Sequence, residues 1–472
     1  MKILLTGTTG YIGRRLLPAL LKAGHEVICC VRDKKRFDLS GYAEGKVSLI
    51  EVNFLHRESL TEIPKDIDAA YYLIHSMSAS NADFEELEKI SALNFKECIQ
   101  KTDVKQVVYL SGIVNEIKLS KHLQSRKQVE EILSSSDFHL TTLRAAIILG
   151  SGSASFEIIR DLVEKLPVMI APKWLSTKSQ PIAIRNVIEF LQGVLLLEYA
   201  YDKSFDIGGP DVLSYKQMLL GFAEVRNLKR RIISVPVLSP KLSSYWLYFV
   251  TSTSFVLAAN LVSSMSVEVI CKPNNLKDLL GIKLLTYKES IELAFGKIQN
   301  EDVVSSWKDA LSSNILETGI TKLLEVPTFG CFIDKRERKV TDVTKTLNKI
   351  WAIGGETGWY YGNWLWSIRG FIDKLYGGVG LRRGRKSNTL IFSGDSLDFW
   401  RVLYANKEEK RLLLYAEMKL PGEAWLEFEI KQDTLYQTAT FRPLGLWGRL
   451  YWYSVLPFHG FIFKGMLKNI AS

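Results

Sequence analysis

The chain has 472 residues, 47% of them hydrophobic and 24% charged, which predicts two folded domains and excludes a disordered chain. A formal net charge of +10 favours anionic ligands or membrane headgroups. Because no nucleic-acid-binding motif is present, we expect no nucleic-acid partner. The cysteines show no metal-type spacing, so we predict no metal site and a reducing cytoplasm; they are Cys29, Cys30, Cys98, Cys271 and Cys331.

The chain opens with an apolar strand that runs into Gly7, Gly10 and Gly13 and then into a helical pattern over 14–24. A second apolar strand, 25–31, follows at the spacing of a βαβ unit. Gly7 permits a tight turn, Gly10 lets phosphates approach the backbone, and Gly13 lets the helix pack on the strand. The motif predicts a dinucleotide pyrophosphate site at the helix N-terminus. Its expected contacts are Thr6, Gly7, Thr9, Gly10, Tyr11, Ile12 and Gly13.

The residues that follow the next strands bear on the choice of cofactor. Arg32, at the end of the second strand, would hold the extra phosphate of NADP, whereas the neighbouring Asp33 would favour the ribose hydroxyl of NAD. We favour NADP and keep NAD as the alternative. Asn53 and Phe54 after the third strand, and His75 after the fourth, complete the predicted cofactor contacts.

Strands and helices alternate through the rest of the first part. Apolar or β-branched runs occupy 47–52, 69–74, 107–111 and 139–143, with helical patterns over 84–101 and 123–133. This alternation predicts an α/β fold with a Rossmann-like, doubly wound parallel sheet. From Gly150 to about Ser290, prolines break the pattern into short helices and loops, which predicts a lid over the cofactor cleft.

The C-terminal part has a different pattern. Five strands are predicted at 389–393, 397–405, 410–419, 423–431 and 434–442, followed by a long aromatic helix over 446–469 that Pro457 should kink. Strands that wrap a terminal helix predict an α+β helix-grip domain with a central cavity. The aromatic residues that would line it are Trp400, Trp425, Tyr436 and Trp452, and a solid aromatic core is the alternative. We therefore predict domains at 1–290 and 311–472, joined by a linker at 291–310.

Two segments bear on location. Leu242–Val267 carries no charge, but its Ser, Thr and Asn content favours buried or surface-docked helices over a membrane span. The basic cluster Arg382, Arg383, Arg385 and Lys386 is either a solvated hairpin or a contact for anionic headgroups. The chain starts directly with a core strand, so no signal peptide is expected. We predict a cytoplasmic protein with peripheral membrane contact.

The first part resembles the extended and atypical short-chain dehydrogenase/reductases. The resemblance rests on the glycine motif, Asn94, Tyr109-Leu-Ser-Gly112 and Leu143-Arg-Ala-Ala-Ile-Ile-Leu-Gly150, and it covers roughly 290 residues. Within the superfamily it looks most like the group of the NmrA-like regulators and the Rossmann subunit of respiratory complex I.

The C-terminal part resembles an uncharacterised bacterial domain that often follows such reductase-like domains and looks like the START-like helix-grip family. The residues that carry this likeness lie in 377–385, 397–402, 416–427 and 450–453. START-like proteins hold apolar ligands, so the resemblance implies an apolar small-molecule ligand or substrate.

The resemblance also implies the catalytic residues. Reductases of this superfamily use Tyr-x-x-x-Lys on a helix, and this chain has His122-Leu-Gln-Ser-Arg126 in its place. His122 could pass a proton and Arg126 could bind ribose hydroxyls, while Ser111 could polarise a substrate carbonyl. His122 and Ser111 could equally satisfy local backbone groups. The implied function is an NAD(P)-dependent oxidoreductase acting on an apolar carbonyl or quinone-like compound, with a non-catalytic NAD(P)-binding sensor or scaffold as the alternative.

Overall fold

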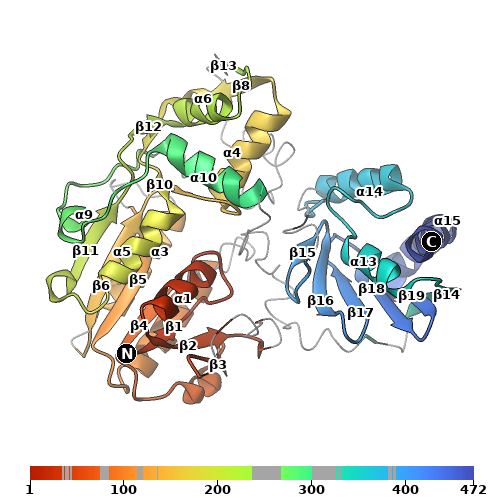
Figure 1. The fold of residues 1–472 in the computed structure, drawn as a ribbon, viewed down its shortest axis with the longest axis horizontal. Helices are drawn as coiled ribbons and strands as arrows, with labels where there is room; N and C mark the ends of the chain where they lie inside the picture. Colours follow the sequence, from red (N-terminus) through yellow and green to blue (C-terminus); the bar gives the residue numbers. More distant parts are fainter. Residues whose placement is uncertain are drawn as a thin grey trace. The chain divides into compact units, whose positions relative to one another are not determined.

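A computed structural model describes residues 1–34, 37, 42, 45–74, 84–113, 121–134, 137–235, 267–299, 326–327, 331–380, 385 and 390–472 (Figure 1). The chain divides into two compact units, and the main boundary along the sequence lies between Ala310 and Leu311. Helix α10 (Tyr287–Gln299) buries Ile291 and Phe295 in the core of the first unit. The first nine residues of the predicted linker are therefore helical, because their apolar side chains complete that core.

The first unit is built on a seven-stranded parallel sheet with the order β11-β6-β5-β4-β1-β2-β3. The strands are β1 (Lys2–Leu5), β2 (Glu26–Val31), β3 (Val47–Glu51), β4 (Ala69–Tyr72), β5 (Gln106–Gly112), β6 (His139–Ala145) and β11 (Lys203–Ile207). Strand order reverses at β1, as in a doubly wound fold, which confirms the prediction. Strand β11 was missed because Lys203-Ser-Phe-Asp lacks a continuous apolar run.

Helices cover both faces of this sheet (Figure 1), so most of its strands are apolar on both sides. One face packs against α1 (Gly13–Lys22) and α5 (Ile184–Gly193), through side chains such as Leu16 and Val187. The other packs against α2 (Phe84–Ile99) and α3 (Lys121–Leu133), through Phe95 and Val129. Because β1, β2 and β3 run parallel, the loops that follow them lie at the same end of the sheet.

Residues after Gly150 form short elements, as predicted. Besides α5, the described helices there are α4 (Ala154–Lys165), α6 (Tyr215–Val225), α9 (Leu276–Leu279) and α10, with 3-10 turns η3 (Lys173–Ser176) and η4 (Glu198–Ala200). A further 3-10 turn, η2 (Arg57–Glu62), lies earlier in the unit. Paired short strands are β7 (Ile148–Leu149) with β10 (Ile182–Ala183), β8 (Val168–Pro172) with β13 (Arg231–Val235), and β9 (Lys178–Ser179) with β12 (Leu213–Ser214). Phe156, Phe222 and Phe295 pack against one another in a third core, with ring centroids 5.4 to 5.7 Å apart. The lid role of this region stays a prediction.

The second unit is a six-stranded antiparallel sheet with the order β14-β19-β18-β17-β16-β15. Its elements are β14 (Phe332–Lys339), α13 (Val343–Trp351), α14 (Asn363–Leu375), β15 (Ser396–Leu397), β16 (Trp400–Asn406), β17 (Arg411–Ala416), β18 (Gly422–Lys431), β19 (Thr434–Pro443) and α15 (Gly445–Ala471). The predicted terminal helix is confirmed as α15, which packs on β14 and β19. The four predicted strands at 397–405, 410–419, 423–431 and 434–442 correspond to β16, β17, β18 and β19, and the first of them also includes the end of β15.

The strand predicted at 389–393 is wrong over its described part. Phe392 donates its amide to the Asp395 carboxylate at 2.9 Å and accepts a backbone bond from Asp395, which closes a turn there instead of a ladder. Strand β14 was missed because Phe332-Ile-Asp-Lys-Arg-Glu-Arg-Lys339 is mostly charged and pairs only along β19.

The predicted cavity aromatics do not share one surface. Trp400 lies with Val402 and Leu414 in the core beneath the helices, whereas Trp425 packs with Tyr415 on the opposite face of the sheet. Successive strand side chains alternate between faces, and this alternation separates the two tryptophans. Tyr436, partly exposed, lies 5.2 Å beneath the Lys335 ammonium, and Trp452 of α15 stacks on Phe332 and Phe441 at 5.2 and 5.8 Å. Trp400, Trp425 and Trp452 are each buried in aromatic or aliphatic packing.

Within the described residues, no helix has both the length and the apolar character needed to cross a membrane. Of the uncharged segment Leu242–Val267, all but Val267 lies outside the described residues.

Candidate cofactor site and adjoining polar cluster

The loop between β1 and α1 is anchored to β4 by Thr6. The Thr6 hydroxyl donates to the carbonyl of Tyr71 at 3.0 Å and accepts the amide of Leu73 at 3.0 Å. Gly7 then turns with φ +63°, a conformation that side chains disfavour. A Cβ on Gly7 would lie 2.5 Å from the Leu73 carbonyl oxygen. Thr6 and Gly7 therefore set the path of the loop.

Gly10 and Gly13 complete the turn into α1. The Gly10 amide donates to the Gly7 carbonyl at 2.8 Å, and a Cβ on Gly13 would lie only 2.4 Å from that same oxygen. Gly10 is exposed, so the space over its Cα is open to a ligand. Among the described residues, the amides of Ile12 and Gly13 have no hydrogen-bond partner. Free amides beside an open glycine at a helix N-terminus fit a pyrophosphate.

Tyr11 and Arg15 join this turn to the chain after β7. The Arg15 guanidinium lies 4.0 Å over the Tyr11 ring and donates to the carbonyls of Tyr11 and Ser151, at 3.1 and 2.8 Å. Gly150 leaves room for the Tyr11 side chain, because a Cβ at Gly150 would lie 2.7 Å from the Tyr11 hydroxyl oxygen. Burial raises the pKa of Tyr11 to about 12, so its hydroxyl stays neutral near pH 7. Sequence reasoning missed Arg15. The predicted contact Thr9 is partly exposed in the loop between β1 and α1.

The remaining predicted cofactor contacts follow β2, β3 and β4. Arg32 is exposed at the end of β2, whereas Asp33 is 4% exposed. Asn53 accepts the amide of Leu55 in a short turn, at 3.2 Å. The Phe54 ring is buried against Phe95, with ring centroids 5.7 Å apart, so its side chain belongs to the core. His75 lies outside the described residues.

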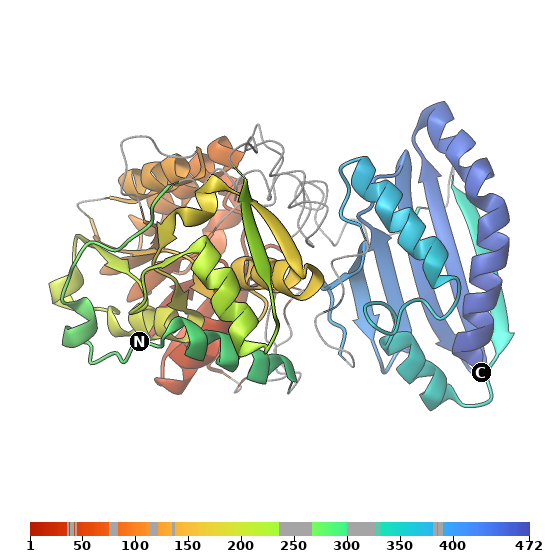
Figure 2. The same ribbon diagram turned by 90° about the horizontal axis from the view of Figure 1, so that it is seen from above.

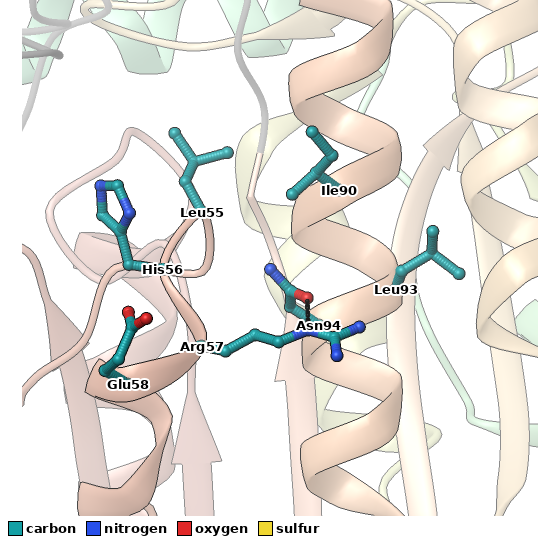
Figure 3. Close-up of a pocket in the computed structure, with 7 residues that line it drawn as sticks. All are labelled: Leu55, His56, Arg57, Glu58, Ile90, Leu93 and Asn94. Atoms are coloured by element: carbon teal, nitrogen blue, oxygen red, sulfur yellow. Dashed lines mark hydrogen bonds between the residues drawn. The ribbon is translucent and has the colours of Figure 1, made fainter.

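A pocket of about 400 Å³ lies directly after β3 (Figure 3). Its wall includes Arg57, whose Nε donates to the Asn94 side-chain oxygen at 2.9 Å, while the Asn94 amide nitrogen donates to the carbonyl of Phe54 at 2.8 Å. This chain of bonds holds the loop after β3 against α2. The lining residues are Leu55, His56, Arg57, Glu58, Ile90, Leu93 and Asn94. Sequence reasoning singled out only Asn94 among them.

Ser111 and Arg126 are brought together at the end of β5. Arg126 Nη1 donates to the carbonyl of Leu110 at 2.9 Å, and the Tyr109 hydroxyl lies 3.4 Å from the carbonyl oxygen of Arg126. Ser111 is 4% exposed, and its hydroxyl has no hydrogen bond of ordinary geometry to any described residue. Burial raises the pKa of Tyr109, while the positive charge of Arg126 and the nearby Ser111 hydroxyl lower that pKa in part.

The helix side of this cluster is also polar. The Ser125 hydroxyl donates to the buried Glu88 carboxylate at 2.5 Å, which joins α3 to α2. His122 lies one turn before Arg126 on α3, but its side chain is outside the described residues. Sequence reasoning missed Tyr109 as a neighbour and the bond between Glu88 and Ser125, because both depend on how the helices dock. Across the parts of the chain described, no cluster of His, Cys, Asp or Glu side chains could hold a metal ion.

Comparison with known proteins agrees with this architecture. Residues 3–117 match the NAD dependent epimerase/dehydratase family. The first unit has the Rossmann fold of that family. Residues 331–466 match a domain described as a protein of unknown function, DUF2867. A photosystem II assembly factor from Synechocystis, Ycf39, is 21% identical over 241 residues, which cover 50% of this chain and 71% of the relative.

Two solved structures have the same fold over the first unit. A nucleoside-diphosphate-sugar epimerase from Staphylococcus aureus is 16% identical, with a TM-score of 0.50; the match covers 62% of this chain and 100% of that one. A triphenylmethane reductase from Citrobacter is 18% identical, with a TM-score of 0.51, over 63% of this chain and 100% of that one. At these identities the similarity concerns the fold.

Proposed function

We propose that this protein is an NADP-dependent oxidoreductase that reduces an apolar carbonyl or quinone-like compound. The observation that carries the proposal is the exposed Gly10 beside the unpartnered amides of Ile12 and Gly13, which fit a pyrophosphate. In this proposal Arg32, exposed at the end of β2, contacts the 2′-phosphate, and NAD is the alternative if Asp33 faces the ribose.

The bound cofactor would supply the hydride, and the chain's own residues would act on the substrate oxygen. The buried Ser111 hydroxyl, which lies close to Tyr109 at the end of β5, is suited to donate a hydrogen bond to a carbonyl. Arg126, held at the end of β5 through the Leu110 carbonyl, is proposed to bind the ribose hydroxyls of the cofactor. His122 is the proposed proton donor, one turn away on α3.

The second unit is proposed to be a START-like domain that presents an apolar substrate, in a cytoplasmic protein with peripheral membrane contact. Its support is the terminal helix α15 packed on an antiparallel sheet. The rival function is a non-catalytic sensor or scaffold in which NADP binding regulates a partner. The observation that favours this rival is the replacement of the Tyr-Lys pair by His122 and Arg126.

The test combines NADPH oxidation against a panel of quinones and aldehydes with a titration of NADPH alone. Turnover that Ser111→Ala lowers by roughly 10²–10³-fold, with NADPH affinity unchanged, is expected of the oxidoreductase. Ser290→Ala is the matched control, because Ser290 is equally buried but its hydroxyl donates to the carbonyl of Thr286, the residue before α10. Binding without turnover would favour the sensor, and binding of neither NADPH nor NADH would refute both functions.

A further inference from the structure

Helix α14 leaves one whole face without a partner among the described residues. Trp366 points into the core and contacts Phe463 of α15, with ring centroids 6.4 Å apart. The opposite face is apolar at spacings of three and four residues, so its side chains form one stripe. The exposed residues are Trp364, Ile368, Phe371, Ile372 and Leu375, followed by Tyr376 at the C-cap.

Helix α15 has a similar outer face, on the same side of the sheet as α14 (Figure 2). Trp452 and Phe463 are buried in the core of the unit, whereas the solvent side of the helix carries large apolar residues. Trp447 is 78% exposed, although a tryptophan is usually well covered. The exposed residues are Leu446, Trp447, Leu450, Tyr453, Leu456, Phe458 and Phe461, preceded by Leu444.

The charged residues on this outer face of α15 are all basic. The helix contains no Asp or Glu, and its basic residues Arg449, Lys464 and Lys468 are all exposed. Lys464 and Lys468 follow Phe461 at i+3 and i+7, so they continue the apolar stripe. None of the three forms an ion pair with a described residue. The acidic residue of α14, Asp373, is buried and accepts the amides of Gly380 and Lys419.

We propose that the outer faces of α14 and α15 together dock on a membrane surface that contains anionic lipid. Exposed tryptophan, tyrosine and phenylalanine beside lysine and arginine, without acidic residues, match the acyl and headgroup layers of such a surface. A second copy of this chain fits less well, because a symmetric contact between these faces would bury basic residues of both copies with no exposed acidic residue of either helix to pair them. The proposal does not depend on catalysis in the first unit.

Of the basic cluster considered from sequence, only Arg385 belongs to the described residues, and it forms no part of this surface. The Arg385 guanidinium donates to the carbonyls of Ile353 and Trp351, at 2.8 and 2.9 Å, and so holds its own loop. Arg382, Arg383 and Lys386 lie outside the described residues.

The experiment is co-sedimentation of the full chain with vesicles of phosphatidylcholine alone or mixed with phosphatidylglycerol. We expect binding to the mixed vesicles that weakens with added salt. Leu450→Glu should reduce the partition coefficient at least tenfold, because it places a charge in the docked face. Leu279→Glu is the matched control, since Leu279 is 50% and Leu450 51% exposed.

The charge requirement is tested separately. Lys464→Glu with Lys468→Glu should abolish the preference for phosphatidylglycerol, whereas Lys216→Glu with Lys229→Glu, on exposed lysines of the first unit, should not. Circular dichroism and thermal melts establish that each variant is folded. Absence of binding by the wild-type chain, or equal losses in the target and control variants, would overturn the proposal. A dimer that Leu450→Glu dissociates, without vesicle binding, would show that a second copy covers the face and would also overturn it.

Discussion

Replacing Gly10 with valine separates nucleotide binding from folding. A Cβ at Gly10 would have its nearest contact at 3.0 Å, with the Gly7 carbonyl oxygen, which asks for a shift of a few tenths of an ångström. The same change at Gly7 would combine φ +63° with a Cβ 2.5 Å from the Leu73 backbone, so that variant would misfold the loop. Gly10→Val should therefore stay folded, at a cost of about 1 kcal/mol.

The loss in affinity follows from the site. A valine side chain over the turn excludes the pyrophosphate from the amides of Ile12 and Gly13, and a hydrogen bond to a charged group contributes about 1.5–3 kcal/mol. Two lost bonds amount to about 3–6 kcal/mol, or at least a hundredfold weaker NADPH binding by titration calorimetry. Gly296→Val on α10, where a Cβ would meet nothing within 4 Å, is the control and should bind normally. A folded Gly10→Val protein with wild-type NADPH affinity would refute the assignment.

Four further outcomes are expected. Arg32→Ala should weaken NADPH binding by about 1.5–3 kcal/mol and leave NADH nearly unchanged in paired titrations; equal losses would remove the NADP preference. Arg401→Met should lower the free energy of unfolding by about 3–5 kcal/mol in urea, because the Glu417 carboxylate 3.0 Å away is also 0% exposed; replacing both with apolar residues should restore most of it. Burial lowers the pKa of His459 to about 4, below its unfolded value of 6.5, so stability should fall by about 3 kcal/mol as pH drops from 6.5 to 4, and His459→Phe should remove that dependence. The isolated segment 311–472 should fold and bind an apolar fluorescent probe; a folded segment without binding would remove the apolar ligand from the proposed function.

The parallel sheet and the glycine loop could be predicted because their signals are local. The spacing of Gly7, Gly10 and Gly13 follows from steric limits within one turn, and the alternation of strands and helices follows from hydrophobic periods of two and 3.6 residues. The terminal helix α15 was predictable for the same reason.

Only the tertiary structure decided which side chains meet. Arg15 reaches the carbonyl of Ser151, 136 positions away, and Arg126 reaches Leu110 from a separate helix. Trp400 and Trp425 looked alike in sequence, yet the pleat of the sheet placed them on opposite faces. The apolar pattern of α15 predicted a helix but not which of its faces is covered. Phe463 and Trp447 are both aromatic, yet only Phe463 is buried in the core of the unit, because the docking of the helix decides which side chains are covered.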